Sequence, residues 1–215
     1  LDAIGKSRYT NLGGDDIDLE IAAFMLGSWE FENGREVTDL ERKYKEILYK
    51  LFLDRSRKYK EEVEDFLSVE EPIPEFFIME EMPYKDGLTK IELKRQLDVF
   101  QYENIVAKFL QPKSDLNIYR PIEEAIAIAG NIDSTFSKSN IDLVLFTGGT
   151  SSMICVHRAL KSYFSGKHCF SIDEDDPCST VALGAAAYRY DEMLGNTNVR
   201  MRNRLLESIF TRIQH

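Results

Sequence analysis

A chain of 215 residues with 43% hydrophobic and 30% charged side chains has the composition of a globular protein, which excludes the disordered and fibrous classes. Its formal net charge of -10 argues against a nucleic-acid partner, because attraction to a phosphate backbone needs clustered Lys and Arg. The sequence contains no run of roughly 18 to 20 apolar residues such as a membrane helix requires, so no membrane partner is expected.

The cysteines and histidines favour a reducing compartment and no metal site. No CxxC pair occurs, and one thiol stays unpaired under any disulfide scheme of Cys155, Cys169 and Cys178. We therefore expect a cytoplasmic setting. No cluster with metal-ligand spacing is formed by the scattered His157, His168 and His215. Because the first residue is Leu rather than Met, we expect the sequence to be a piece of a longer protein.

The first third of the chain is predicted to be helical. Turn residues at 11–16 precede an apolar pattern with spacings of three and four, which predicts a helix interrupted by Gly27 and by the Asn33-Gly34 turn. Residues 38–67 contain neither Gly nor Pro and carry an apolar stripe among dense charges. This pattern indicates one long helix or two abutting ones.

The middle of the chain is predicted to hold one strand and two further helices. Pro72 and Pro74 end the long helical region, and a strand is expected at 75–79. Thr89 and Glu92 have the spacing of a capping box, which predicts a helix continuing towards Phe109. A fourth helix is expected from about 118 to 130.

A strand, a glycine turn and a helix follow one another in the last third. Residues 141–146 are nearly all apolar, as in a strand buried on both faces, and run into Thr147-Gly148-Gly149-Thr150-Ser151-Ser152. A helix is expected to resume at about 154. A polar loop then leads to Asp176-Pro177, which has the form of a helix start.

The double glycine at 148 and 149 is the first candidate for a binding site. A backbone without side chains can approach a flat ligand, and the following helix offers free N–H groups and a partial positive charge. These features suit a nucleotide. The same turn is also a routine tight connection between a strand and a helix, so it does not choose between the two explanations.

Three segments, in chain order, resemble the heat-shock protein 70 family. They are Leu12-Gly13-Gly14-Asp15-Asp16-Ile17-Asp18, then Leu88-Thr89-Lys90 before Glu92, and finally Leu145-Phe146-Thr147-Gly148-Gly149-Thr150 followed by Asp176-Pro177 and Val181-Ala182-Leu183-Gly184-Ala185-Ala186. The similarity extends over about residues 1 to 194. It implies an α/β fold, namely an actin-like ATPase lobe with a ribonuclease H-like part-sheet and flanking helices, plus a helical and small-sheet subdomain.

The resemblance also implies a division of the chain. Residues 1–14 and 111–194 would belong to subdomain IIA of the lobe, and residues 15–110 to subdomain IIB. Residues 195–215 would be a linker and the start of a downstream region.

The implied ligand is ATP or ADP. Gly148 and Gly149 would lie against adenosine, with Thr150 near the ribose or the phosphates. Ser152 stands where the family usually places an Arg that stacks on adenine, and Cys178 stands at an acidic position of the family.

A family helix with a Glu followed by Lys-Arg would also face the adenine. Two alignments of this helix with the present sequence are possible. Alignment on Leu67-Ser68 gives Glu61 and Glu64 and reverses the charge, whereas a shifted alignment gives Asp54, Arg57 and Lys58 and restores it.

The expected function is that of a nucleotide-binding lobe in a chaperone ATPase, with protein clients or co-chaperones as partners of the parent protein. The lobe alone would not hydrolyse ATP, because the catalytic Lys, the phosphate loops and the Mg²⁺-associated Asp of the family are outside this sequence. Two alternatives stay open. The lobe could be degenerate and serve as a protein docking module, or the chain could be a filament-forming or sugar-kinase relative.

Overall fold

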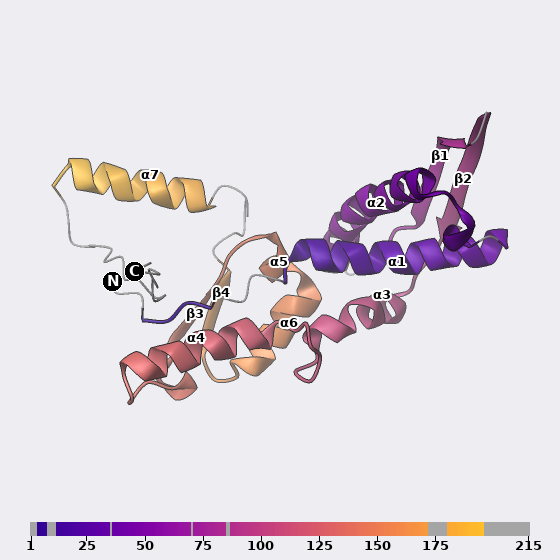
Figure 1. Cartoon of the computed structure of the whole chain (residues 1–215). Coiled ribbons are helices and arrows are strands. Elements are labelled where there is room, and N and C mark those ends of the chain that lie inside the picture. Colours follow the sequence, from indigo (N-terminus) through magenta and orange to yellow (C-terminus); the bar gives the residue numbers. More distant parts are fainter. Residues whose placement is uncertain are drawn as a thin grey trace, which may run out of the picture. The chain divides into compact units, whose positions relative to one another are not determined.

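The computed structural model describes residues 4–7, 12–34, 36–69, 71–84, 87–171 and 180–195. The chain divides into two compact units (Figure 1). One unit, here called the glycine-turn unit, contains Leu1–Asn11, Ile118–Ser152 and Leu160–His215. The other, called the helical unit, contains Leu12–Asn117 and Met153–Ala159. Within the described ranges, no helix combines the length and the apolar character that crossing a membrane would need.

Two long helices form the framework of the helical unit. Helix α1 (Gly14–Asn33) packs along α2 (Arg42–Ser68), which follows a short 3-10 turn, Val37–Asp39 (Figure 1). The predicted interruption at Gly27 is wrong. A glycine inside a helix costs only about 1 kcal/mol relative to Ala, and α1 offsets this by burying a stripe of apolar side chains on both sides of it. The buried side chains are Ile17, Ile21, Ala22, Met25, Leu26 and Trp29.

Both helices end as the sequence predicts. Gly34 adopts a left-handed conformation with φ 59° and donates its N–H to the carbonyl of Glu30, which closes the last turn of α1. Helix α2 is one continuous helix of 27 residues rather than two abutting ones. It ends at Ser68, ahead of the two prolines.

A β-hairpin follows where the sequence predicted a strand and then a helix. Strand β1 (Phe76–Tyr84) pairs antiparallel with β2 (Gly87–Arg95), with Phe76 opposite Arg95. The predicted helix from Thr89 is therefore wrong over its first seven residues. Alternate residues of β2, Ile91 and Leu93, are buried, which is the period of a strand. The helical pattern seen in the sequence came from Leu93 and the residues after it.

Helix α3 (Val99–Val106) begins ten residues after the predicted start. Its capping box is formed by Asp98 and Gln101. The Asp98 carboxylate accepts the backbone N–H of Gln101 at 2.7 Å, and the Gln101 side-chain oxygen accepts the N–H of Asp98 at 3.0 Å. A 3-10 turn, Ala107–Leu110, continues the helix to the break before Pro112.

Aromatic side chains from three elements form the core of the helical unit. Trp29 of α1 lies 6.4 Å from Phe52 of α2, and Phe52 lies 6.2 Å from Phe76 of β1, measured between ring centroids. Tyr59 packs edge-on against Phe76 at 5.3 Å. These contacts fix the hairpin against the pair of helices.

The glycine-turn unit contains helix α4, a small parallel sheet and helix α7. Helix α4 (Tyr119–Ile132) and a 3-10 turn, Lys138–Asn140, lead to strand β3 (Leu143–Phe146). Strand β3 pairs in parallel with β4 (His168–Ser171), which the sequence analysis placed in a polar loop. After β3 come α5 (Gly149–Ser152) and α6 (Ile154–Tyr163). The last described helix is α7 (Thr180–Met193), and the predicted start at Asp176-Pro177 lies outside the described residues.

Strand β3 is less buried than its composition predicted. Phe146 is buried, but Leu143 and Leu145 remain 49% and 52% exposed among the described parts of the chain. A strand that is apolar on both faces needs cover on both faces, and the described sheet has only two strands.

Candidate functional site

The glycine turn after β3 leaves bare backbone open. Gly148 has φ +85°, a conformation that side chains other than glycine rarely adopt. A Cβ atom built on Gly148 or Gly149 meets no described atom within 4 Å. The turn therefore presents peptide backbone without side chains at the end of strand β3, with room for an added Cβ.

Hydrogen bonds from the backbone and the side chain of Ser151 close this turn. The backbone N–H of Ser151 donates to the carbonyl of Gly148 at 3.0 Å. Its hydroxyl lies 2.8 Å from the carbonyl oxygens of both Thr147 and Gly148. Thr150 is half-buried within the turn. The structure describes the backbone of Ser152 but not its side chain, and Cys178 lies outside the described residues.

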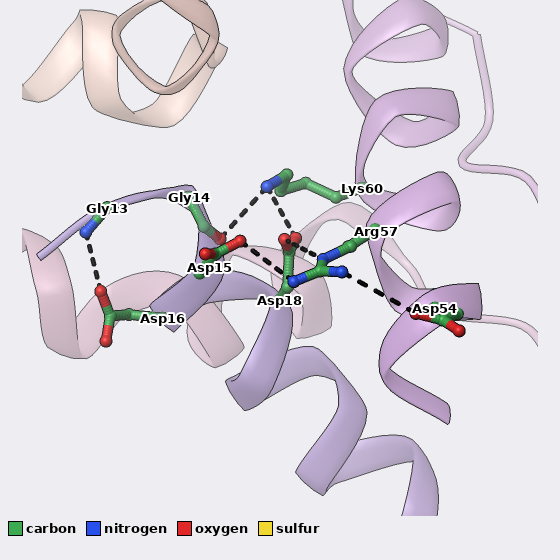
Figure 2. Close-up of polar contacts among 8 residues, drawn as sticks. All are labelled: Gly13, Gly14, Asp15, Asp16, Asp18, Asp54, Arg57 and Lys60. Carbon is green, nitrogen blue, oxygen red and sulfur yellow. Dashed lines mark hydrogen bonds and ion pairs between the residues drawn. The ribbon is translucent and has the colours of Figure 1, made fainter. Parts of the chain in front are cut away.

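Two of the candidates from the shifted alignment, Asp54 and Arg57 on α2, form a charge cluster with the start of α1 (Figure 2). The guanidinium of Arg57 lies 3.3 Å from Asp15, 3.6 Å from Asp18 and 3.8 Å from Asp54. Lys58, next to it, is exposed. The structure thus brings Asp54 and Arg57 together, and the Arg57 guanidinium lies within ion-pair distance of three carboxylates.

Lys60 completes this cluster, although the sequence analysis did not single it out. Its ammonium lies 2.6 Å from the carboxylate of Asp18 and donates to the carbonyl of Gly14 at 3.2 Å (Figure 2). Asp18 is only 3% exposed, and a buried carboxylate is tolerated when it is paired with a cation. A sequence signal existed, because Asp18 falls at helical spacing with the buried Ile21 and Ala22.

Both carboxylate oxygens of Glu64 accept hydrogen bonds within the helical unit. Its Oε2 accepts the backbone N–H of Ile154 at 2.7 Å, and its Oε1 accepts the hydroxyl of Tyr102 at 3.2 Å. Burial raises the pKa of Glu64, while these two hydrogen bonds and the charge of Lys60 act in the opposite direction. Glu61, one turn earlier, is exposed.

The thiol beside this carboxylate is not activated. Cys155 is buried, and burial together with the negative charge of Glu64 raises the pKa of its thiol to about 12. A thiol with this pKa stays protonated at neutral pH and is a poor nucleophile. Cys155 is therefore a core residue rather than a nucleophile.

A family comparison decides the relationship of this chain. The model of the Hsp70 protein family matches residues 4–200, which is most of the sequence. This chain belongs to the Hsp70 family. The resemblance inferred from the sequence is confirmed. Hsp70 proteins are ATPases of the actin-like fold that bind ATP and ADP, and the mixed helices and small sheets described above are consistent with that fold.

Curated relatives in the Hsp70 family are similar over most of this chain. The chaperone protein dnaK of Cyanidioschyzon merolae is 24% identical over 185 residues, covering 86% of this chain and 26% of the relative. The chaperone protein DnaK of Deinococcus deserti is 27% identical, covering 82% of this chain and 24% of the relative. The chaperone protein dnaK1 of Prochlorococcus marinus is 26% identical, with coverages of 82% and 23%. The chain thus spans about a quarter of the length of these relatives.

Within this Hsp70 chain the predicted site residues fall in both units. Gly148, Gly149, Thr150 and Ser152 belong to the glycine-turn unit, whereas all candidates on α2 belong to the helical unit. The Thr89 segment, which contributed to the resemblance, lies in a strand rather than at a helix start. Among the described residues, no group of three or more His, Cys, Asp or Glu side chains is arranged to hold a metal ion.

Proposed function

We propose that this chain forms the adenosine-facing part of the ATPase domain of an Hsp70 chaperone, comprising subdomain IIB and the latter part of subdomain IIA. The open backbone at Gly148 and Gly149 carries this proposal. A purine is flat and can lie against peptide groups that have no side chains.

The bound nucleotide supplies the phosphoanhydride bond, and this chain supplies the contacts to the base and the sugar. Thr150 and the backbone of the turn orient the ligand. Phosphoryl transfer depends on charge neutralisation around the γ-phosphate, which in this proposal comes from another part of the protein together with Mg²⁺. The chain alone therefore binds without hydrolysing. Client proteins and co-chaperones would be partners of the whole protein.

Calorimetry on the protein at its natural full length tests the proposal, with ADP and ATP as probes. Gly149→Arg places a long side chain on the proposed seat and is expected to weaken the affinity by at least about tenfold, or 1.4 kcal/mol. Gly27→Arg is the matched control. Like Gly149, Gly27 has no described atom within 4 Å of an added Cβ and no positive φ.

A second candidate function is a degenerate lobe that acts as a protein docking module. This function is supported by the charged candidate residues, because their side chains already contact other residues of this chain. Arg57 contacts three carboxylates, both oxygens of Glu64 accept hydrogen bonds, and Ser152 replaces the usual Arg. If the natural protein binds neither ADP nor ATP even at millimolar concentration, the docking function replaces the nucleotide-binding one.

A further inference from the structure

We propose that the outer face of α1 binds a second copy of this chain, with Phe31 of each copy inserted beside Gly27 of the other. This face, here called the α1 face, is lined by residues of α1 between Ala23 and Glu32 and by Arg95 at the end of β2. All of these residues belong to the helical unit. The proposal goes beyond the proposed function, because it concerns self-association rather than a nucleotide.

The first observation is an open hollow of about 470 Å³ on the α1 face. Gly27 is exposed on this face, and a Cβ built on it meets no described atom within 4 Å. Phe24 and Phe31 lie one turn before and one turn after Gly27 on the same side of the helix. The missing side chain of Gly27 thus leaves a notch between two aromatic side chains, in a hollow large enough to take an aromatic ring.

The second observation is that Phe31 protrudes from the same face. Its side chain is 89% exposed, compared with 38% for Phe24. A glycine inside a helix and an aromatic ring in water are both unfavourable for a separate chain, and here they are one turn apart. Local features of this kind often mark a functional surface. A second copy explains both of them, because its Phe31 would fill the notch at Gly27.

The third observation is that the α1 face carries a cation and an anion. The Nη1 of Arg95 lies 3.9 Å from a carboxylate oxygen of Glu32, which is beyond hydrogen-bond distance. The Nε of Arg95 is buried and has no hydrogen-bond partner among the described residues. Glu32 follows Phe31 in the chain, so inserting Phe31 into the hollow of another copy also brings Glu32 to the Arg95 that lines this hollow.

A second copy is the occupant that these features fit. The α1 face carries a protruding ring, a notch and both signs of charge, so it is self-complementary, as a two-fold symmetric dimer requires. The symmetry repeats the insertion of Phe31 and the contact between Arg95 and Glu32 on both sides of the interface. This chain has a net charge of -10, so two copies repel each other at long range. We therefore expect a weak dimer, with a dissociation constant of the order of 100 µM.

Sedimentation velocity of the natural full-length protein tests the dimer, at about 0.15 M salt and at chain concentrations up to about 200 µM. Phe31→Ala removes the protruding ring, and Gly27→Gln fills the notch with a good helix former. Each substitution is expected to raise the dissociation constant of the dimer at least about tenfold. The midpoint of urea unfolding, measured on the monomer, should stay the same for Phe31→Ala and should not fall for Gly27→Gln.

Charge reversal distinguishes a contact between copies from a contact within one copy. Arg95→Glu places two acids opposite each other at both sides of the dimer, and Glu32→Arg places two cations there. Each variant alone should therefore dimerise at least about tenfold more weakly than the wild type. A mixture of the two variants again joins an acid to a cation on both sides, so their heterodimer should have a dissociation constant within about threefold of the wild type. A fluorophore on one variant detects the heterodimer.

The control for net charge is the exposed ion pair on α2. Arg42→Glu and Glu46→Arg change the charge of the chain by the same amounts as the reversals on the α1 face. They should leave the dissociation constant of the dimer within about threefold of the wild type. Circular dichroism confirms that each variant is folded. If Arg95→Glu does not fold, Phe31→Ala and Gly27→Gln decide the question by themselves.

Three results would overturn the proposal. The first is a wild type that stays monomeric at about 200 µM, which would leave the α1 face to a different protein. The second is a dimer that survives Phe31→Ala and Gly27→Gln, because it must form through another surface. The third is a mixture of Arg95→Glu and Glu32→Arg that forms no heterodimer. Nucleotide titrations that use Gly27→Arg as the control are run well below the dissociation constant of the dimer, so that self-association does not affect them.

Discussion

The ammonium of Lys60 on α2 lies 2.6 Å from the buried carboxylate of Asp18 on α1, and this ion pair joins the two long helices of the helical unit. Lys60 also donates to the carbonyl of Gly14, so the same side chain holds the first residue of α1. Removing one partner of a buried pair leaves the other charge buried and uncompensated.

Lys60→Met is therefore expected to destabilise the helical unit by about 3 kcal/mol, because Arg57, 3.6 Å from Asp18, offsets only part of the loss. Urea unfolding followed by tryptophan fluorescence measures this, since Trp29 is the single tryptophan and is buried in this unit. The double variant Asp18→Asn with Lys60→Met should be less destabilised than the sum of the single variants. Additive effects would show that the two side chains do not interact.

Arg55 is expected to contribute to stability through its planar geometry rather than its charge. It makes two parallel hydrogen bonds with Glu62 at 3.1 and 2.8 Å, donates to the carbonyl of Phe77 at 2.8 Å, and lies over the rings of Tyr59 and Phe76. A lysine cannot reproduce these contacts.

Arg55→Lys should lower the free energy of unfolding by about 2 kcal/mol, measured by the same urea titration. Arg42→Lys serves as the control, because Arg42 is exposed and pairs with an exposed Glu46. Exposed pairs contribute about 0.5 kcal/mol or less. Equal effects of the two substitutions would contradict the assigned role of Arg55.

The start of α3 gives a third prediction. Asp98→Ala removes the acceptor for the Gln101 N–H and should destabilise the helical unit by about 1 kcal/mol, whereas Asp98→Asn should cost only a few tenths of that. Thr89→Ala tests the position that the sequence favoured as a cap. Since Thr89 lies in β2, its substitution should not change the helical content measured by circular dichroism.

The mistake at Thr89 shows what the sequence can and cannot specify. Ile91 and Leu93 alternate as in a strand, while Leu93 and Leu97 have the spacing of a helix, so a short apolar set fits both periods. Pairing with β1 decides between them, and that pairing is not visible in local spacing. Long segments with a sustained period, such as α2 and, apart from the expected break at Gly27, α1, were predicted as helices because packing repeats the same pattern over several turns.

The same limit applies to the candidate site. The glycine turn could be located because an apolar strand and a double glycine are adjacent in the chain. Strand β4 was missed because its four residues gain their partner only through β3. The contacts of Glu64 join residues separated by 38 and 90 positions, so sequence spacing alone could not reveal them.

The pH dependence of stability gives a last prediction, which concerns Glu64. Burial raises the pKa of Glu64 in the folded protein above its ordinary value of 4.5, so the folded state binds this proton more tightly than the unfolded state does. The corresponding stability is fully present below pH 4.5 and is lost as the pH rises through the raised pKa.

In Glu64→Gln the side chain at this position does not titrate, so it contributes no pH dependence to the free energy of unfolding. Wild-type protein should therefore lose stability relative to Glu64→Gln as the pH rises from about 4.5 towards neutrality, because only the wild type must ionise a buried carboxylate. Urea unfolding of both proteins at several pH values in this range measures the difference. A difference that is constant with pH would mean that Glu64 has the same pKa in the folded and unfolded states. A difference of the opposite sign would mean that the hydrogen bonds from Ile154 and Tyr102 outweigh burial and lower the pKa instead.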